Sequence, residues 1–120
     1  MQNLNFYFQE YAQLLATGAN LEIIDRFYAD EFEQYENMIL AFTDKASVRK
    51  HEEKALKKVN DLKISIRNVA IEEELQIVWG EMTNEFEDKQ KGKQKLVEAF
   101  FQQWDNGKIV EQRFYYKGLE

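Results

Sequence analysis

The hydrophobic residues at the start of the chain recur with the period of an α-helix. Four of them, spaced at i, i+4, i+7 and i+11, form one apolar stripe: Leu4, Phe8, Tyr11 and Leu15. Gly18 is expected to end this helix, because glycine readily adopts the left-handed conformation found just beyond helix ends. The pattern therefore predicts an amphipathic helix ahead of Gly18.

A second, shorter helix is predicted next, with Asn20 as its N-terminal cap. Glu22 lies four residues before Arg26, the spacing at which opposite charges pair on a helix surface. The residues expected to point inward are Leu21, Ile24, Phe27 and Tyr28. A short strand over 32–38 and a third helix capped by Asp44 complete this half of the chain. The inner face of the third helix is expected to carry Val48, His51, Ala55 and Val59.

From residue 61 onward the period changes to that of β-strands. Leu62, Ile64 and Ile66 alternate with polar residues, which predicts a half-buried strand. A second strand is predicted over 75–87, and residues 89–93 form the turn into a third. Consecutive strands joined by tight turns pair antiparallel, so the second half of the chain predicts an antiparallel sheet.

The strongest local signal is the pair Asn106-Gly107, flanked by runs of aromatic and β-branched residues. It predicts a hairpin with a type I′ turn, because both central residues of that turn need positive φ. Helices followed by an antiparallel sheet indicate an α+β fold.

Composition limits the class of protein. A chain of 120 residues with 44% hydrophobic residues can build its own core, so we predict one domain over residues 1–120. The absence of cysteine excludes disulfide bonds and thiolate chemistry. No apolar run approaches the roughly 20 residues that a membrane span needs, and the N-terminus lacks a signal-peptide pattern. We expect a soluble, cytoplasmic protein with no membrane partner.

The charge pattern and the known motifs exclude further classes. The net charge of −6 argues against a nucleic-acid partner, and acidic residues interleave the basic clusters over 45–63 and 89–95. We therefore interpret those clusters as solvated surfaces. One histidine without cysteine cannot build an ordinary zinc site, and phosphate-binding or dinucleotide-binding glycine motifs are absent. We expect no metal and no cofactor.

The order and spacing of several phrases resemble the NTF2-like superfamily, in particular its SnoaL-like and ketosteroid-isomerase-like branch. The phrases lie at 14–18, 27–31, 46–52 and 104–113, and they read LLATG, FYADE, ASVRKHE and WDNGKIVEQR. The resemblance implies an NTF2-like cone, in which N-terminal helices pack on a strongly curved antiparallel β-sheet. A largely apolar pocket opens between the two layers. The fold hosts isomerases, cyclases, dehydratases and binding modules, so it does not imply an activity.

The same resemblance assigns candidate roles to two residues. The tyrosine that donates to a developing oxyanion in the isomerase branch falls on Tyr11, and the carboxylate that moves the proton falls on Glu36. The position of a further oxyanion donor falls on Phe100, which cannot donate a hydrogen bond. Steroid isomerisation is therefore not expected. Tyr11 also fits a packing role, and Glu36 fits an exposed strand position.

Two other residues are candidates for proton transfer. His51, the only histidine, is followed by Glu52, so it is either a general base oriented by a carboxylate or a hydrated residue at the pocket rim. Strand alternation places Glu98 on the face that the resemblance turns inward, where burial would raise its pKa and make it an acid. A slip of one residue in register would reverse that face.

The residues expected to line the pocket are Phe8, Phe27, Phe32, Phe100, Gln102 and Trp104. We hypothesise that the pocket holds a small apolar ligand, with proton-transfer chemistry of the isomerase, cyclase or dehydratase type on a carbonyl group. The alternatives are a non-catalytic ligand-binding module and a homodimeric scaffold for protein interaction. The homodimer would form through the outer sheet face, which carries Val97 and Phe101. The sequence leaves open whether the protein is an enzyme.

Overall fold

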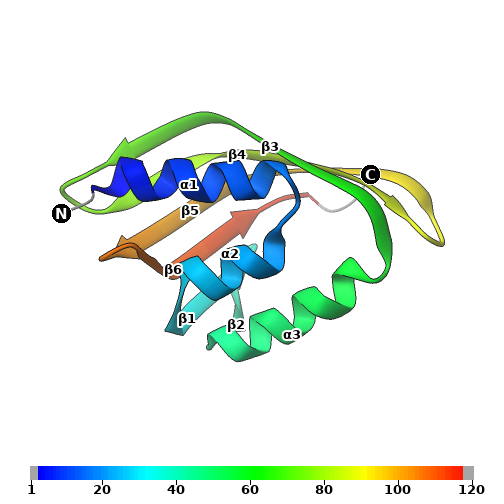
Figure 1. The fold of residues 1–120 in the computed structure, drawn as a ribbon, viewed down its shortest axis with the longest axis horizontal. Helices are drawn as coiled ribbons and strands as arrows, with labels where there is room; N and C mark the ends of the chain where they lie inside the picture. Colours follow the sequence, from blue (N-terminus) through cyan, green and yellow to red (C-terminus); the bar gives the residue numbers. More distant parts are fainter. Residues whose placement is uncertain (1–2, 118–120) are drawn as a thin grey trace.

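The fold consists of three helices packed on one face of a curved six-stranded sheet, in a computed structural model that describes residues 3–117 (Figure 1). The helices are α1 (Leu4–Ala16), α2 (Asn20–Phe27) and α3 (Lys45–Leu56). The strands are β1 (Tyr28–Glu36), β2 (Ile39–Phe42), β3 (Val59–Glu72), β4 (Ile77–Asp88), β5 (Gly92–Asp105) and β6 (Lys108–Tyr115). The predicted α+β class is confirmed, with the helices packed on a curved sheet.

The strand order is β2-β1-β6-β5-β4-β3. Strands β3 to β6 follow one another as the predicted antiparallel meander, and β2 pairs antiparallel with β1. The pairing of β1 with β6 is parallel, which the sequence pattern did not predict. It joins the first strand of the chain to the last, and thereby adds β1 and β2 to the sheet beside β6.

The hairpin between β5 and β6 is confirmed. Asn106 has φ 50° and Gly107 has φ 80°, the positive values that a type I′ turn needs. The sheet is bent by irregularities in pairing, two of them in β3, where Asp61 and Asn68 each have φ 56°. Such bulges bend a strand and increase its twist, and β3 arches over α1 in Figure 1.

Capping was predicted correctly for α3 and incorrectly for α2. Asp44 caps α3, since its side chain accepts a hydrogen bond from the Ser47 backbone N–H at 2.7 Å. Asn20, by contrast, is the first residue of α2, and Ala19 stands at the cap position without a side-chain hydrogen bond. The Asn20 amide bonds to α3 instead, so a tertiary partner outcompetes the local cap.

The ion pair predicted within α2 is also replaced by a tertiary one. Arg26 pairs with Glu10 of α1, at 3.4 Å, rather than with Glu22. The inward face of α2 is centred on Ile23 and Ile24, while Leu21 is only partly buried. On α3 only Val48 is buried, and the predicted fourth member of its apolar stripe, Val59, begins β3.

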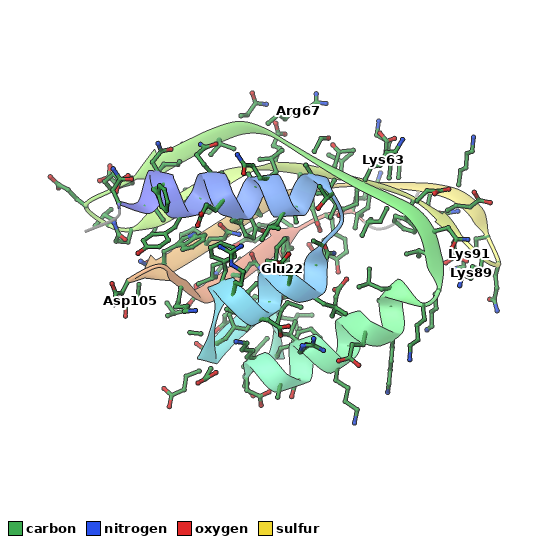
Figure 2. All side chains as sticks on the ribbon, viewed as in Figure 1. Glu22, Lys63, Arg67, Lys89, Lys91 and Asp105 are labelled. Carbon is green, nitrogen blue, oxygen red and sulfur yellow. The ribbon has the colours of Figure 1, made fainter. Side chains whose placement is uncertain are left out.

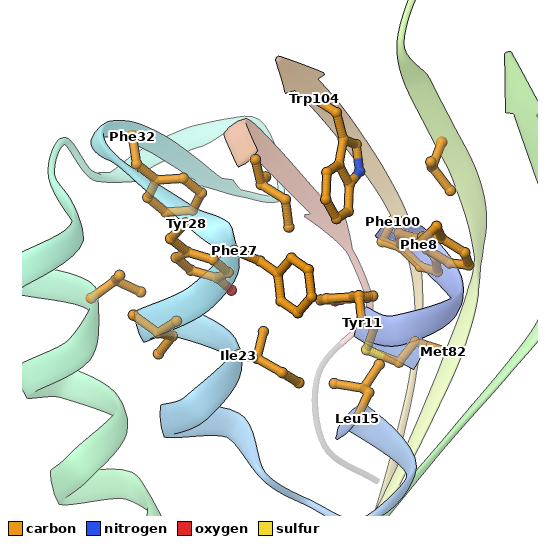
Figure 3. Packing of buried hydrophobic residues seen from close by; sticks show 14 of the residues in the cluster. Phe8, Tyr11, Leu15, Ile23, Phe27, Tyr28, Phe32, Met82, Phe100 and Trp104 are labelled. Atoms are coloured by element: carbon orange, nitrogen blue, oxygen red, sulfur yellow. The ribbon is translucent and has the colours of Figure 1, made fainter. Parts of the chain in front are cut away.

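The core fills the space between α1, α2 and the middle of the sheet (Figure 3). The Trp104 ring meets Tyr11 and Phe27 edge-on, with ring centroids 6.0 and 5.9 Å apart. Phe100 lies over Gly80 of the neighbouring strand, where a Cβ atom would stand 2.9 Å from the phenyl ring. The predicted inner face of β5 is confirmed, because Glu98, Phe100, Gln102 and Trp104 are all buried.

The charged residues lie mainly on the outside. Figure 2 shows Lys63 and Arg67 pointing away from β3, and Lys89 and Lys91 pointing outward from the β4–β5 turn. Lys63 stands in register with Glu85 of β4, so opposite charges face each other across the strands. Within residues 3–117, no helix has both the length and the apolar character that crossing a membrane requires.

Candidate functional site

A cavity of about 460 Å³ opens between the helices and the inner face of the sheet. All four residues predicted from the sequence as candidates for proton transfer line it: Tyr11, Glu36, His51 and Glu98. They come from α1, β1, α3 and β5 respectively. The fold therefore gathers side chains from distant parts of the chain around one volume.

Glu98 is the most strongly perturbed carboxyl group of this cavity. It is only 9% exposed, and the Asn84 side-chain amide donates a hydrogen bond to its Oε1 at 3.0 Å. Burial raises the pKa of Glu98 to about 7, because an ionised carboxylate loses its hydration. The Asn84 hydrogen bond lowers the pKa in part, and the negative charges of Glu36 and Glu52 raise it further. At neutral pH the group is therefore poised between its acid and base forms.

Glu36 is held by two donors at the end of β1. The Gln34 amide donates to its Oε2 at 2.9 Å, and the Tyr116 hydroxyl donates to its Oε1 at 3.0 Å. Burial and the hydrogen bond to Glu36 raise the pKa of Tyr116 to about 12, which keeps that hydroxyl protonated as a donor. The Glu36 carboxylate thus has a defined orientation at the cavity wall.

Tyr11 combines a place in the core with a place on the cavity wall. Its ring is 2% exposed and packs against Phe27 and Trp104. Burial raises the pKa of Tyr11 well above its ordinary value, Gln102 lowers it in part, and the charge of Glu98 raises it further. The hydroxyl is therefore a proton-bearing donor at any physiological pH.

His51 lies at the mouth of the cavity. Its side chain is exposed, and its ring packs against Phe42 with centroids 5.2 Å apart. The neighbouring Glu52 also lines the cavity, but it accepts a hydrogen bond from the Asn20 side-chain amide at 3.2 Å. The carboxylate that was a candidate to orient the imidazole is thus engaged with α2.

The aromatic residues expected to line the pocket lie elsewhere. Five aromatic residues and one glutamine that were expected to line the pocket are all buried, and none of them lines the cavity: Phe8, Phe27, Phe32, Phe100, Trp104 and Gln102. They fill the space between α1, α2 and the sheet, because large rings so closely spaced pack against one another and leave no void. The cavity is lined instead by aliphatic residues, carboxylates, amides and a different set of aromatic residues, among them Tyr28, Phe42 and Phe114.

A row of buried glutamines runs from the cavity wall, where Gln34 lies, into the core. Gln34, Gln112 and Gln102 stand in register on β1, β6 and β5. The Gln102 amide donates to the Gln112 carbonyl oxygen at 2.7 Å, and Gln112 in turn donates to the Tyr28 hydroxyl at 2.8 Å. The Trp104 indole donates to Gln102 at 3.0 Å and extends the row into the core.

Tyr28 is a member of the site that was not among the candidates predicted from the sequence. Its phenol lines the cavity, and burial raises the pKa of Tyr28 well above its ordinary value. Because Gln112 donates to the hydroxyl oxygen, the hydroxyl proton remains free to be donated to a ligand. No local signal marks this role, since the two residues are 84 positions apart in the chain.

No part of the described chain, residues 3–117, gathers three or more histidine, aspartate or glutamate side chains in a way that could hold a metal ion. The chemistry available in the cavity is that of carboxyl groups, phenols, amides and one imidazole. These groups can donate and accept hydrogen bonds and can move protons.

Residues 8–112 match the SnoaL-like domain family. Among solved structures, a proposed SnoaL-like polyketide cyclase from Mesorhizobium loti superposes with a TM-score of 0.76 and 20% identity, covering 96% of this chain and 100% of that one. An LEH-like epoxide hydrolase from M. tuberculosis superposes with a TM-score of 0.72 and 14% identity, covering 92% of this chain and 76% of that one. AclR from Streptomyces galilaeus, a proposed hydroxylase, superposes with a TM-score of 0.77 and 16% identity, covering 95% of this chain and 88% of that one.

No curated protein matches the sequence. The structural similarities, all at low identity, show a shared fold, and the domain match covers most of the chain. The predicted resemblance to the NTF2-like superfamily is thereby confirmed. The chain belongs to the SnoaL-like family.

Proposed function

We propose that the cavity binds a small, largely apolar molecule with a carbonyl group, and that the protein transfers a proton on that molecule. The volume of about 460 Å³ lies in the range of ligand sites, which are typically about 300–1,000 Å³. The observation that carries the proposal is the convergence of Tyr11 and Glu98 on this cavity, with the pKa of Glu98 raised to about 7. A general base works best when its pKa lies near the working pH.

The proposed roles follow from the chemistry of each group. Tyr11 donates a hydrogen bond to the carbonyl oxygen and stabilises the negative charge that develops there. Ionised Glu98 takes a proton from the carbon next to the carbonyl; the C–H electron pair becomes the C=C bond of an enolate, and the C=O π pair moves to the oxygen. Where a C=C bond is conjugated with the enolate, Glu98 returns the proton to the far carbon of that system, the C=O bond re-forms, and an isomerisation results. Where the molecule carries a β-hydroxyl group, the enolate electrons form a new C=C bond as the C–O bond breaks, and the hydroxyl group leaves as water with the proton from Glu98.

Tyr28 supplies a second hydroxyl donor of the cavity. The position at which the isomerase branch has a further oxyanion donor is Phe100 in this chain, and phenylalanine cannot donate. The free hydroxyl proton of Tyr28 makes it a donor, and its oxygen is held by Gln112. Glu36 and His51 are the further groups able to hold or deliver a proton, the first within the cavity and the second at its mouth. Similar folds that are described as cyclase, epoxide hydrolase and hydroxylase support a role in small-molecule chemistry.

The test is exchange of carbon-bound hydrogen in D₂O, followed by ¹H NMR for a set of small aryl ketones such as 4-phenylbutan-2-one. Loss of the α-proton signal in the presence of the protein, well above the rate with Glu98→Gln, is the expected result. Tyr11→Phe should slow the exchange without lowering the melting temperature. Glu111→Gln, on the other side of the sheet, serves as the control.

Binding of the ketones without exchange would leave a ligand-binding module and remove the enzymatic proposal. No binding of any ketone, with the protein folded, would remove the proposal altogether.

We propose in addition that the outer sheet face is covered by a second copy of the chain. Trp79 is 46% exposed and Val97 53%, and the Trp79 and Phe101 rings pack together with centroids 4.8 Å apart. Charged residues of both signs flank this apolar patch in register, such as Glu85 between Lys63 and Lys95. A face that carries both signs can meet a rotated copy of itself with opposite charges matched.

A further inference from the structure

The charges that line the cavity are almost entirely negative. Three glutamates face it, namely Glu36, Glu52 and Glu98, and the lining includes neither lysine nor arginine. His51 is the one residue of the lining that can carry a positive charge, and it lies exposed at the mouth. Arg49, on the same helix as Glu52, does not line the cavity and pairs with Asp25 and Glu53 instead.

The three carboxylates act on the same volume. The negative charges of Glu36 and Glu52 both raise the pKa of Glu98, and they also raise that of Tyr28. Two groups on different elements thus experience the same pair of charges. Glu36 lies on β1, Glu98 on β5 and Glu52 on α3, so the sheet and the helix layer both contribute negative charge to the cavity.

An unpaired acceptor lies on the same wall. The Oδ1 atom of Asn20 is buried and accepts no hydrogen bond from the described residues. The orientation of this amide is determined by Glu52, because the Asn20 Nδ2 donates to its Oε1 at 3.2 Å, and a flipped amide would place two acceptors together. A buried acceptor without a donor is costly, so the site favours a ligand that brings an N–H group.

The arrangement suits an organic cation rather than a metal ion. Within residues 3–117 these carboxylates do not come together closely enough to coordinate a metal. They surround a volume that also contains aromatic rings, among them Phe42, Tyr28 and Phe114. An ammonium group can hydrogen-bond to carboxylates and lie against aromatic rings, while the rest of its molecule packs on apolar side chains.

We infer that the ligand of this cavity carries a protonated amino group on an apolar body, and that Glu52, Glu36 and the Asn20 carbonyl oxygen recognise that group. The inference rests on the proposed function, since it names the class of molecule that occupies the proposed ligand site. A ligand with a carboxylate or phosphate is disfavoured, because the negative charges of the lining would oppose it and no lysine or arginine of the lining would pair with it.

The experiment compares three probes of nearly equal size and shape: 4-phenylbutan-2-amine, 4-phenylbutan-2-one and 4-phenylbutanoate. Dissociation constants are measured by chemical-shift titration of the full chain at pH 8, where an alkyl amine is still protonated. We expect the amine to bind about 10-fold or more tighter than the ketone, the effect of one charge-assisted hydrogen bond. The carboxylate is expected not to bind.

The deciding variant is Glu52→Gln, and its matched control is Glu53→Gln. Both remove one charge from the same helix, but Glu53 pairs with Arg49 and does not line the cavity. Glu52→Gln should abolish most of the preference for the amine and leave the ketone affinity within about 2-fold, whereas Glu53→Gln should change neither. Melting temperatures of both variants show that the fold is retained.

The possible results separate the ligand site itself from the preference of that site for an amine. If the ketone binds and the amine binds no more tightly, the inference about charge is overturned while the ligand site stands. A preference for the amine that survives in Glu52→Gln would overturn the assignment of that residue. If none of the probes shifts a resonance of the cavity residues, the cavity is not a site for ligands of this class and both proposals fail.

Discussion

The side-chain amide of Asn84 donates a hydrogen bond of 3.0 Å to Oε1 of Glu98 on the neighbouring strand. This bond favours the ionised carboxylate, yet the pKa of Glu98 is still raised to about 7, because burial has the larger effect. The two opposing influences place the group near neutrality. Proton transfer by Glu98 near neutral pH depends on this balance.

Removal of the Asn84 amide should raise the pKa of Glu98, because the hydrogen bond that favours the ionised carboxylate is lost. We predict that Asn84→Ala raises the pKa of Glu98 further, by roughly one unit, since a hydrogen bond to a charged group contributes about 1.5–3 kcal/mol and one pKa unit corresponds to about 1.36 kcal/mol. A ¹³C NMR titration of the Glu98 carboxyl measures the pKa directly. An unchanged or lower pKa would show that water replaces Asn84 without loss.

The raised pKa of Glu98 should also appear in the stability of the protein. The folded pKa of about 7 lies above the ordinary value of 4.5, so between these pH values the folded state binds more protons than the unfolded state. Stability should therefore fall as the pH rises from about 4.5 to 7, and the full penalty should remain above that range. Protonation at low pH removes it.

Glu98→Gln keeps a hydrogen-bond acceptor for Asn84 and cannot ionise. We predict that this variant is roughly 2 kcal/mol more stable than the parent chain at pH 8, and that the difference disappears below about pH 4.5. Urea unfolding at the two pH values measures it. Equal stability of both proteins at pH 8 would mean that the Glu98 carboxylate is hydrated and its pKa ordinary.

The glutamine row should behave as one unit. Gln112 accepts a hydrogen bond from Gln102 and donates to Tyr28 and, at a longer 3.4 Å, to Gln34. Gln112→Leu has nearly the same size but leaves these partners unsatisfied in the core, so we predict a loss of roughly 2–4 kcal/mol in the free energy of unfolding.

The control for that variant is Gln9→Leu, on the exposed side of α1. Its unfolding free energy should change by less than about 0.5 kcal/mol. A similarly small effect of Gln112→Leu would indicate that the row is dispensable and that the wall of the cavity does not depend on it.

The proposed dimer predicts the oligomeric state of the parent chain and of its variants. Phe101→Asp places a charge in the aromatic patch with Trp79, so we predict that the sedimentation coefficient changes from that of a dimer to that of a monomer. Leu75→Asp, in the exposed β3–β4 turn, is the matched control and should leave the dimer intact. A parent chain that sediments as a monomer at all concentrations would refute the proposed second copy.

Several elements could be predicted from local residues because the interactions that form them are local. The Asp44 cap reaches only three residues ahead, and the Asn106-Gly107 turn needs only its own two φ angles. The alternation that buries Glu98 follows from the period of a strand, whichever strands lie beside it. The same holds for the apolar stripe of α1.

Local patterns misplaced those side chains whose partners are distant in the chain. Arg26 has Glu22 within reach on its own helix but pairs with Glu10 of another, and Asn20 binds α3 instead of capping α2. The aromatic residues assigned to the pocket became the core, because a sequence does not show which of its large side chains meet one another. The packing of these aromatic residues against one another determines where the cavity lies.

The sequence by itself therefore determined the helices, the antiparallel meander, the inward face of β5 and the family. The tertiary structure alone decided the parallel pairing of β1 with β6, which sets Gln34 beside Gln112 and brings Tyr28 to the cavity. It also decided that three carboxylates share one volume. The physical reason is that period and turn preference act over a few residues, whereas strand pairing across the chain and the position of a cavity depend on the packing of all elements together.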